Sequence, residues 1–232
     1  MAGPLDPIVR TAFRSLARLR GARAMHPRGL TLAARLDVAG DGPLPTGPAA
    51  CTVRLSTSLG LPGALPDVLG LALRVEVDGS PVDVVAASCA GPDRLRRSLL
   101  WPALSWRGTR LTTLLPYASS AADRVVVLLS VDETAASSAD VGRVAARLPM
   151  RVSVRVVGRR GDVQTGDLVV TGPATADVSF DPVLHPPPGW RLVPGWLSAV
   201  RAASYDASRD GRHAPAASLE ALSPARAPSP TP

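Results

Sequence analysis

Hydrophobic and polar residues alternate with a period of two along most of the chain from residue 29 to residue 171, which is typical of half-buried β-strands. Segments rich in Val, Leu, Thr and Ala are separated by Gly, Pro and Asp. The sequence predicts strands at residues 30–38, 51–57, 69–77, 81–88, 111–115, 124–131, 151–158 and 167–171. Asp78-Gly79 between two of these segments is a hairpin signal. Short strands at this spacing predict an antiparallel sheet that closes, or nearly closes, into a barrel.

Helical spacing is found near the start of the chain and in one short segment at 138–147. Residues 6–23 space their apolar side chains along one helical face, and another face carries Arg10, Arg14 and Arg18. A basic amphipathic helix can bind acidic lipid or a partner. A solvated helix that covers one end of the domain is the favoured interpretation.

The chain changes character after residue 181, where the segment HPPPGWRLVPGW is a Pro-rich connector that excludes a central strand or a helix. A last helix is predicted at 197–212. The expected fold is α+β but mainly β, an antiparallel barrel of about eight strands with an N-terminal and a C-terminal helix. The expected organisation is an N-terminal helix and arm at 1–28, the barrel at 29–181, the connector and last helix at 182–213, and a disordered tail at 214–232.

Arginine supplies all 26 basic residues against 19 acidic ones, which gives a formal net charge of +7. The chain has no lysine and no asparagine, a bias typical of GC-rich coding, so the high pI need not reflect a partner. The arginines are spread along the chain without an RNP-like aromatic pair, and nucleic-acid binding is not expected. Apolar runs are too short to span a bilayer, and arginines interrupt the region where a signal peptide needs its apolar core. A cytoplasmic bacterial protein is expected.

Few residues are arranged for metal or nucleophilic chemistry. Cys51 and Cys89 form no CxxC motif, and both are expected to be small buried residues. His26, His185 and His213 are far apart and lack clustered carboxylates, which argues against a zinc site or a two-metal hydrolase. GxSxG, Walker and GxGxxG motifs do not occur. A phosphodiesterase is an alternative with little support, since a phospholipase-D-type HxK motif requires lysine.

The predicted C-terminal helix carries one polar stripe. Arg201, Tyr205, Ser208 and Arg212 fall within about 60° of arc at 100° per residue. A tyrosine with arginines one and two turns away therefore lies along a single line. A surface stripe of polar residues is the alternative interpretation.

Two further polar groups lie near the first strands. Arg54 and Ser56 share one face of their predicted strand by the two-residue period, together with Thr52 and Ser58. His26 precedes a proline, which keeps the residue extended where the chain enters the first strand. Each group on its own is more often structural than catalytic.

Several short motifs follow one another in a fixed order along the first half of the chain. They are Arg-x-x-His-Pro-Arg-Gly at 23–29, Val-Arg-Leu-Ser at 53–56, Asp67, Gly-Leu-Ala-Leu-Arg-Val at 70–75 and Asp-Val-Val at 83–85. This order resembles the core of haem catalases and their catalase-like relatives. It covers about residues 20–90, and 197–212 again at the far end. The resemblance implies a short, single-barrel relative, of the kind sometimes labelled phosphodiesterase.

The resemblance implies roles for residues on both sides of a haem. His26 corresponds to the distal catalytic histidine and Ser56 to its hydrogen-bonded neighbour. Arg23 and Arg54 correspond to arginines that bind the haem propionates, a bidentate role that suits guanidinium. On the other side the family has Arg-x-x-x-Tyr with a further arginine seven residues on.

Arg201, Tyr205 and Arg212 reproduce that proximal spacing. Tyr205 is thereby implied as the axial ligand of the haem iron, with a nearby cation stabilising its phenolate. The sequence also departs from the family. Ala87 stands where the family has an asparagine that orients peroxide, and Leu55 replaces a phenylalanine.

The expected function is that of a haem-binding catalase-like protein with weak peroxidase activity toward peroxide or organic hydroperoxides. His26 would take a proton from the peroxide and return it to the leaving oxygen. Dismutation of hydrogen peroxide is less expected because the asparagine is missing. The alternative is a catalase-like barrel that has lost haem and serves as a binding or structural module. A homo-oligomer is compatible with either function.

Overall fold

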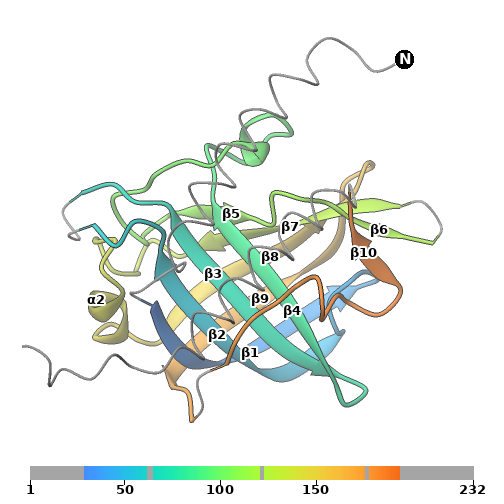
Figure 1. Ribbon diagram of the computed structural model, residues 1–232, viewed down its shortest axis with the longest axis horizontal. Coiled ribbons are helices and arrows are strands. Elements are labelled where there is room, and N and C mark those ends of the chain that lie inside the picture. The colour runs from blue at the N-terminus through green and yellow to red at the C-terminus, as the bar shows by residue number, and fades with distance from the viewer. Residues whose placement is uncertain (1–28, 62–64, 121–122, 176–177, 194–232) are drawn as a thin grey trace, which may run out of the picture.

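The alternating segments pair with one another to form a closed antiparallel barrel. The computed structural model describes residues 29–61, 65–120, 123–175 and 178–193. The barrel strands are β1 (Gly29–Gly40), β2 (Gly47–Thr57), β3 (Leu69–Val77), β4 (Ser80–Ser88), β5 (Arg110–Thr112), β7 (Arg124–Val131), β8 (Met150–Val157) and β9 (Asp162–Pro173). Their order is β7-β5-β4-β3-β2-β1-β9-β8, and β8 closes the barrel by pairing with β7 (Figure 1). The eight predicted strands are confirmed.

Two further strands extend the sheet beyond the barrel. β6 (Tyr117–Ser119) pairs with β7, and β10 (Trp190–Leu192) pairs with β6. The sequence did not predict either strand, and each is only three residues long. β10 belongs to the Pro-rich connector and lies at the edge of the sheet, which agrees with the expectation that the connector forms no central strand.

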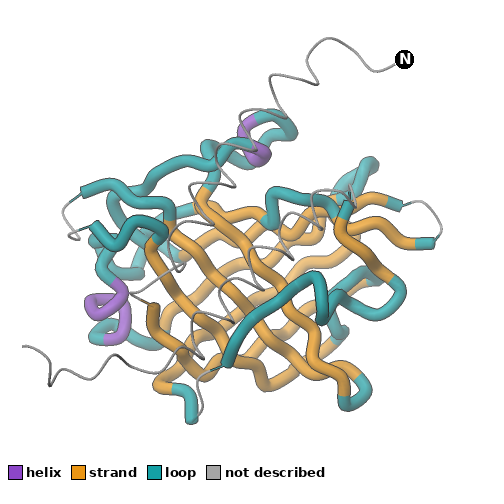
Figure 2. Tube along the Cα trace, in the orientation of Figure 1, coloured by secondary structure: helices purple, strands orange, loops and turns teal. Residues whose placement is uncertain are grey.

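Helices contribute little to the described part of the chain, which contains α2 (Val141–Ala145) and the single 3₁₀ turn η1 (Arg96–Ser98) (Figure 2). α2 confirms the centre of the helix predicted at 138–147. The Asp140 carboxylate caps it by accepting a hydrogen bond of 2.8 Å from the Gly142 amide. The helices predicted at 6–23 and 197–212 lie outside the described residues. The mainly β architecture is therefore confirmed, and the terminal helices stay predictions.

The predicted hairpin at Asp78-Gly79 is confirmed. Both residues have positive φ, 50° and 74°, as a two-residue type I′ turn requires. Val77 pairs with Ser80 on either side of the turn, and this register places Arg74 directly opposite Asp83.

Aliphatic side chains from the barrel strands fill the interior. Leu36, Val53 and Leu71 are at most 1% exposed and belong to one continuous core. Trp106 closes one end, where its indole nitrogen donates to the Ala139 carbonyl at 3.1 Å. An eight-stranded barrel is just wide enough for its side chains to fill. A ligand of this protein is therefore expected on the barrel wall rather than inside.

Gln164 closes the other end of the barrel and is 1% exposed. Its amide oxygen accepts from the Leu44 amide at 3.1 Å, and its amide nitrogen donates to the Leu44 carbonyl at 2.9 Å. The chain's single glutamine thus satisfies the buried backbone of the β1–β2 turn, which would otherwise lose hydrogen bonds to water.

The outer face of the barrel differs from one side to the other. On β8 the outward positions are the exposed polar residues Arg151, Ser153 and Arg155. On β3 and β4, opposite β8 in the strand order, several outward positions carry small apolar side chains that are only partly exposed. A sheet face with few polar groups is typical of a covered face. The β3–β4 side is therefore where the barrel wall is suited to binding.

Candidate functional site

Two rows of paired residues cross the outer wall over β2, β3 and β4. In one row Ser56 pairs with Gly70, which pairs with Ala87. In the adjacent row Arg54 pairs with Ala72, which in turn pairs with Val85. We call these six residues the β2–β4 platform. Its centre is made of Gly and Ala, so a flat ligand could approach the strand backbone closely.

Arg54 and Ser56 are the two predicted site residues that the structure describes, and it brings them to one face as the sequence pattern predicted. The Arg54 guanidinium donates to the Thr31 hydroxyl at 3.3 Å. It also covers Gly29, where a Cβ atom would lie only 2.7 Å from it, so glycine leaves room for the arginine. Ser56 is 7% exposed and donates to the Gly70 carbonyl at 3.4 Å.

The other predicted site residues lie outside the described part of the chain. They are Arg23, His26, Arg201, Tyr205 and Arg212. Their placement beside the platform and their roles stay predictions.

Next to the platform lies a charged cluster that the sequence analysis did not predict. Asp83 on β4 is fully buried, and Arg74 on β3 binds it with two hydrogen bonds of 2.7 and 2.5 Å. The ring nitrogen Nδ1 of His185 lies 3.0 Å from the same carboxylate. The Asp181 amide donates to it at 2.7 Å. Every oxygen of this buried carboxylate is therefore satisfied.

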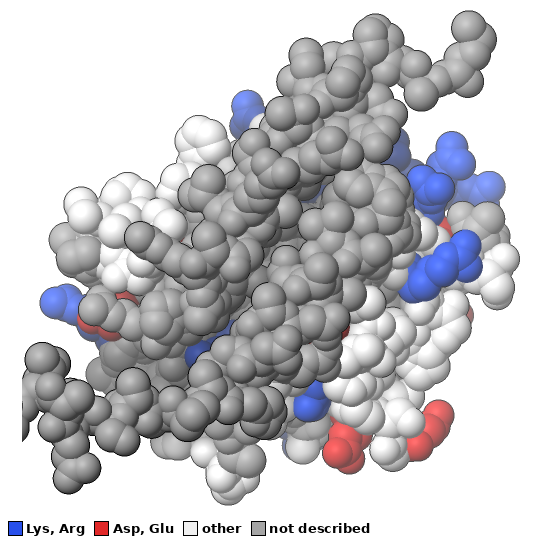
Figure 3. Space-filling view, viewed as in Figure 1, with Lys and Arg blue, Asp and Glu red and all other residues white. Residues whose placement is uncertain are grey.

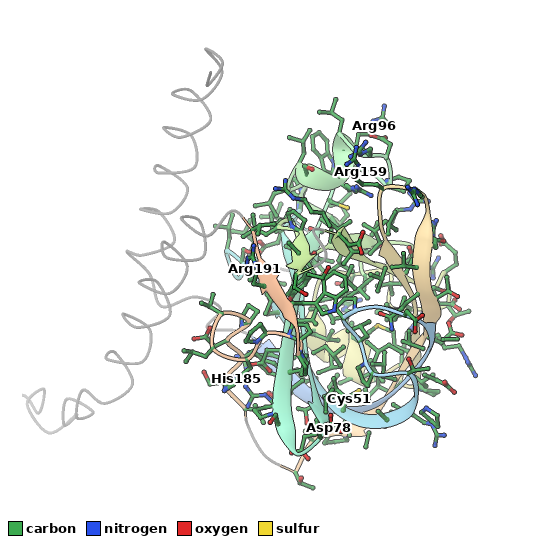
Figure 4. The ribbon with its side chains drawn as sticks, turned by 90° about the vertical axis from the view of Figure 1, so that its right-hand side faces the viewer. Cys51, Asp78, Arg96, Arg159, His185 and Arg191 are labelled. Carbon is green, nitrogen blue, oxygen red and sulfur yellow. The ribbon has the colours of Figure 1, made fainter. Side chains whose placement is uncertain are left out.

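The cluster fixes the Pro-rich connector to the barrel wall. The Asp83 amide donates to the His185 carbonyl, and the Arg74 guanidinium donates to the Ser179 carbonyl. The Arg74 guanidinium also lies over the Phe180 ring, 5.6 Å from its centre. Figure 4 shows His185 on the connector outside the barrel, beside the strands of the β3–β4 hairpin. Residues 179–185 thus form a strap across the β3–β4 wall.

The hairpin signal alone could have revealed half of this cluster. Arg74 and Asp83 are each four residues from the Asp78-Gly79 turn, so a two-residue hairpin places them in one pair. The contribution of His185 could not be predicted, because its partner is 102 positions away and no local pattern joins them.

The two cysteines agree in part with the prediction that both are buried. Cys89 is buried, whereas Cys51 is half-buried near the end of the barrel (Figure 4). Burial raises the pKa of the Cys51 thiol to about 12, and burial also raises the pKa of Cys89. Neither thiol has the depressed pKa of a reactive cysteine.

We expect both cysteines to resist thiol reagents in the folded protein at pH 8. This pH is far below the Cys51 pKa of about 12, so little reactive thiolate is present. Ellman's reagent should report almost no thiol in the native protein and two per chain after unfolding in guanidinium. Rapid reaction of one thiol in the native state would contradict this expectation.

A protein-built metal centre finds no support in the described residues, where no three His, Cys, Asp or Glu side chains come together. A haem differs in this respect, since one axial side chain suffices to hold its iron. No helix of the described ranges is long and apolar enough to cross a membrane.

Comparison with known proteins supports the fold. No family model and no curated protein matches the sequence. Among solved structures the chain is similar to catalase A from Saccharomyces cerevisiae, with 13% sequence identity and a TM-score of 0.57. The likeness covers 87% of this chain and 63% of the catalase chain. At this level of identity it shows the fold, a catalase-like β-barrel.

Proposed function

We propose that the protein binds haem against the β2–β4 platform and acts as a peroxidase, which reduces peroxides or organic hydroperoxides with electrons from a reducing co-substrate. The observation that carries this proposal is the position of Arg54 and Ser56 on the small-residue wall of a catalase-like barrel. The sequence order of the same residues resembles the haem-binding core of catalases. Fold and residue pattern therefore support the same ligand.

The described residues fit one side of a haem. Gly70, Ala72 and Ala87 provide a flat apolar surface of the kind a porphyrin face requires. Arg54 lies at the edge of that surface, where a guanidinium pairs with a propionate. Its contact with the Thr31 hydroxyl orients it. In the proposal, Arg23 serves as a second partner for the propionates.

The remaining roles fall to residues outside the described ranges. Tyr205 holds the iron, and Arg201 and Arg212 favour its phenolate form. Bound haem supplies the redox iron needed to cleave an O–O bond. His26 accepts a proton from the peroxide and delivers it to the leaving oxygen, with Ser56 as its neighbour. Ala87 carries no amide to orient a peroxide, which favours peroxidase activity over dismutation.

A barrel that has lost haem is the second candidate function, and Ala87 is the observation that favours it. The chain contains no asparagine that could replace the missing amide. Such a protein would use the β2–β4 platform to bind a different partner, or as a purely structural surface.

Absorbance spectroscopy separates the two candidates. We expect the full chain to take up hemin with one Soret band per protein and the features of tyrosinate-ligated ferric haem. Tyr205→Phe should abolish that spectrum, whereas Tyr117→Phe should leave it unchanged because Tyr117 is 1% exposed in the core. A colourless protein that refuses added hemin would overturn the proposal. An unchanged spectrum in Tyr205→Phe would exclude Tyr205 as the axial ligand.

A further inference from the structure

Seven of the nine exposed large hydrophobic side chains of the described residues lie on two loops at one end of the barrel. The loop after β2 carries Leu59, Leu61 and Leu65, which are 67%, 37% and 48% exposed. The loop after β4 carries Leu95, Leu99, Trp101 and Leu104, which are 51–75% exposed. We call these seven side chains the leucine rim. Contiguous exposed hydrophobic groups of this kind mark interaction sites.

The two loops form one surface because hydrogen bonds join them. The backbones of Asp67 and Ala103 exchange two hydrogen bonds, of 3.1 and 2.8 Å. The Ser88 hydroxyl donates to the Trp101 carbonyl and accepts from the Leu69 amide. The carboxylate of Asp67, itself 1% exposed, accepts from the Leu59 and Leu61 amides and fixes the first loop.

The surface beside the leucine rim is positively charged. Arg94, Arg96 and Arg97 lie within the second loop, and Asp93 pairs with Arg96 alone, at 3.6 Å. No carboxylate of the described residues is within ion-pair distance of Arg94 or Arg97. Burial, and then the charge of Arg94, lower the pKa of Arg97, so an anion at this place would relieve a local repulsion.

Figure 3 shows a stretch of uncharged described surface at the upper left with blue side chains above it, while red side chains lie at the lower right, by the β3–β4 hairpin, and in a smaller group on the left. Leucines, a tryptophan and unpaired arginines in one strip are the composition of surfaces that rest on anionic lipid. We propose that the leucine rim and its arginines dock the protein on an anionic membrane surface. The leucines and Trp101 would enter the interface between headgroups and acyl chains.

This chemistry favours lipid over a protein partner. Arg94, Arg96 and Arg97 flank the leucines of the second loop, where Asp93 is the one carboxylate, so the excess positive charge favours an anionic surface as the occupant. Arginine near an anionic leaflet gains about a factor of five in binding for each residue. Arg94 and Arg97 together should therefore contribute roughly 25-fold at low salt.

Vesicle sedimentation with the full chain tests the proposal. We expect binding to phosphatidylcholine vesicles that contain phosphatidylglycerol, and little binding to phosphatidylcholine alone. The double variant Arg94→Gln/Arg97→Gln should bind roughly 25-fold more weakly at low salt. Leu99→Ser/Trp101→Ser should also lose binding. Binding should shift the tryptophan emission to the blue, and Trp101→Phe should remove most of that shift.

Matched variants on other parts of the surface serve as controls. Arg159→Gln/Arg160→Gln changes two exposed arginines on the turn at the other end of the barrel, and Leu184→Ser changes an exposed leucine of the connector. Both should bind like the original chain, and all variants should unfold at the same urea concentration. Failure to bind anionic vesicles would overturn the proposal.

Two other outcomes would also overturn it and would name a different occupant. If Arg10→Gln/Arg14→Gln/Arg18→Gln abolishes vesicle binding while the rim variants keep it, the N-terminal residues bind the lipid. If the rim variants instead abolish a concentration-dependent dimer in sedimentation velocity, a second copy of the chain covers the rim. Hemin uptake is measured separately, so neither outcome depends on the proposed haem site.

Discussion

Asp83→Ala is expected to lower the free energy of unfolding by about 3 kcal/mol, because it removes the carboxylate that three groups share. The substitution leaves Arg74 half-buried without its counter-ion, and it removes the acceptor of the Asp181 amide and of His185. Loss of one partner from a buried ion pair costs about 3–5 kcal/mol. The lower end applies here, since the Arg74 side chain is 21% exposed and reaches water.

The barrel supplies a matched control on its opposite side. Arg155 and Asp162 form the same type of two-bond pair across β8 and β9, with both distances 2.9 Å. Their side chains are 51% and 29% exposed, so water already solvates them. Asp162→Ala should therefore cost about 1 kcal/mol or less. Urea denaturation of the two variants compares a buried pair with an exposed one in the same geometry.

If Asp83→Ala and Asp162→Ala lower the free energy of unfolding equally, burial of Asp83 does not add to its contribution to stability. A small loss for Asp83→Ala, with rapid proteolysis between β9 and β10, would show that the cluster holds only the strap. In that case the barrel folds independently of the connector. The strap would then be a separable unit that Asp83 fastens to the wall.

The barrel was predictable from the sequence because its signals are local. Alternation marks strands such as β1, β3 and β8, and a short apolar run marks β7. Asp78-Gly79 fixes the β3–β4 register, which pairs Arg74 with Asp83. The same alternation placed Arg54 and Ser56 on the outer face. What the sequence missed depends on distant contacts. His185 reaches Asp83 from 102 positions away, and β10 exists only because β6 offers it an edge.

One part of the candidate site could be predicted from local signals in the sequence, and the other part could not. The two-residue strand period and the strand register place the residues of the β2–β4 platform, and all six lie within the described ranges. The implied ligand residues of the site, His26 and Tyr205, belong to segments beyond the described residues, and no local pattern of the sequence predicts a contact between them and the wall. The wall can nevertheless be tested alone, since it is the surface against which we propose that haem binds.

Ala72→Phe is therefore expected to abolish hemin binding, or to weaken it by at least about tenfold. Ala72 lies between Arg54 and Val85 in one row of the platform, at an outward position. Its neighbours Leu71 and Leu73 point inward and are at most 2% exposed, so the new ring cannot enter the barrel. It must occupy the space over Gly70 and Ala72 that a flat ligand needs.

Ser153→Phe gives the same added ring on the opposite wall, at an exposed outward position of β8. This control should bind hemin like the original chain, and both variants should unfold within about 1 kcal/mol of it. A hemin titration followed at the Soret band measures the difference. If Ala72→Phe binds hemin normally, the haem does not lie on the platform. If both variants lose binding equally, uptake depends on general surface properties, and Arg54 and Ser56 have no specific role in it.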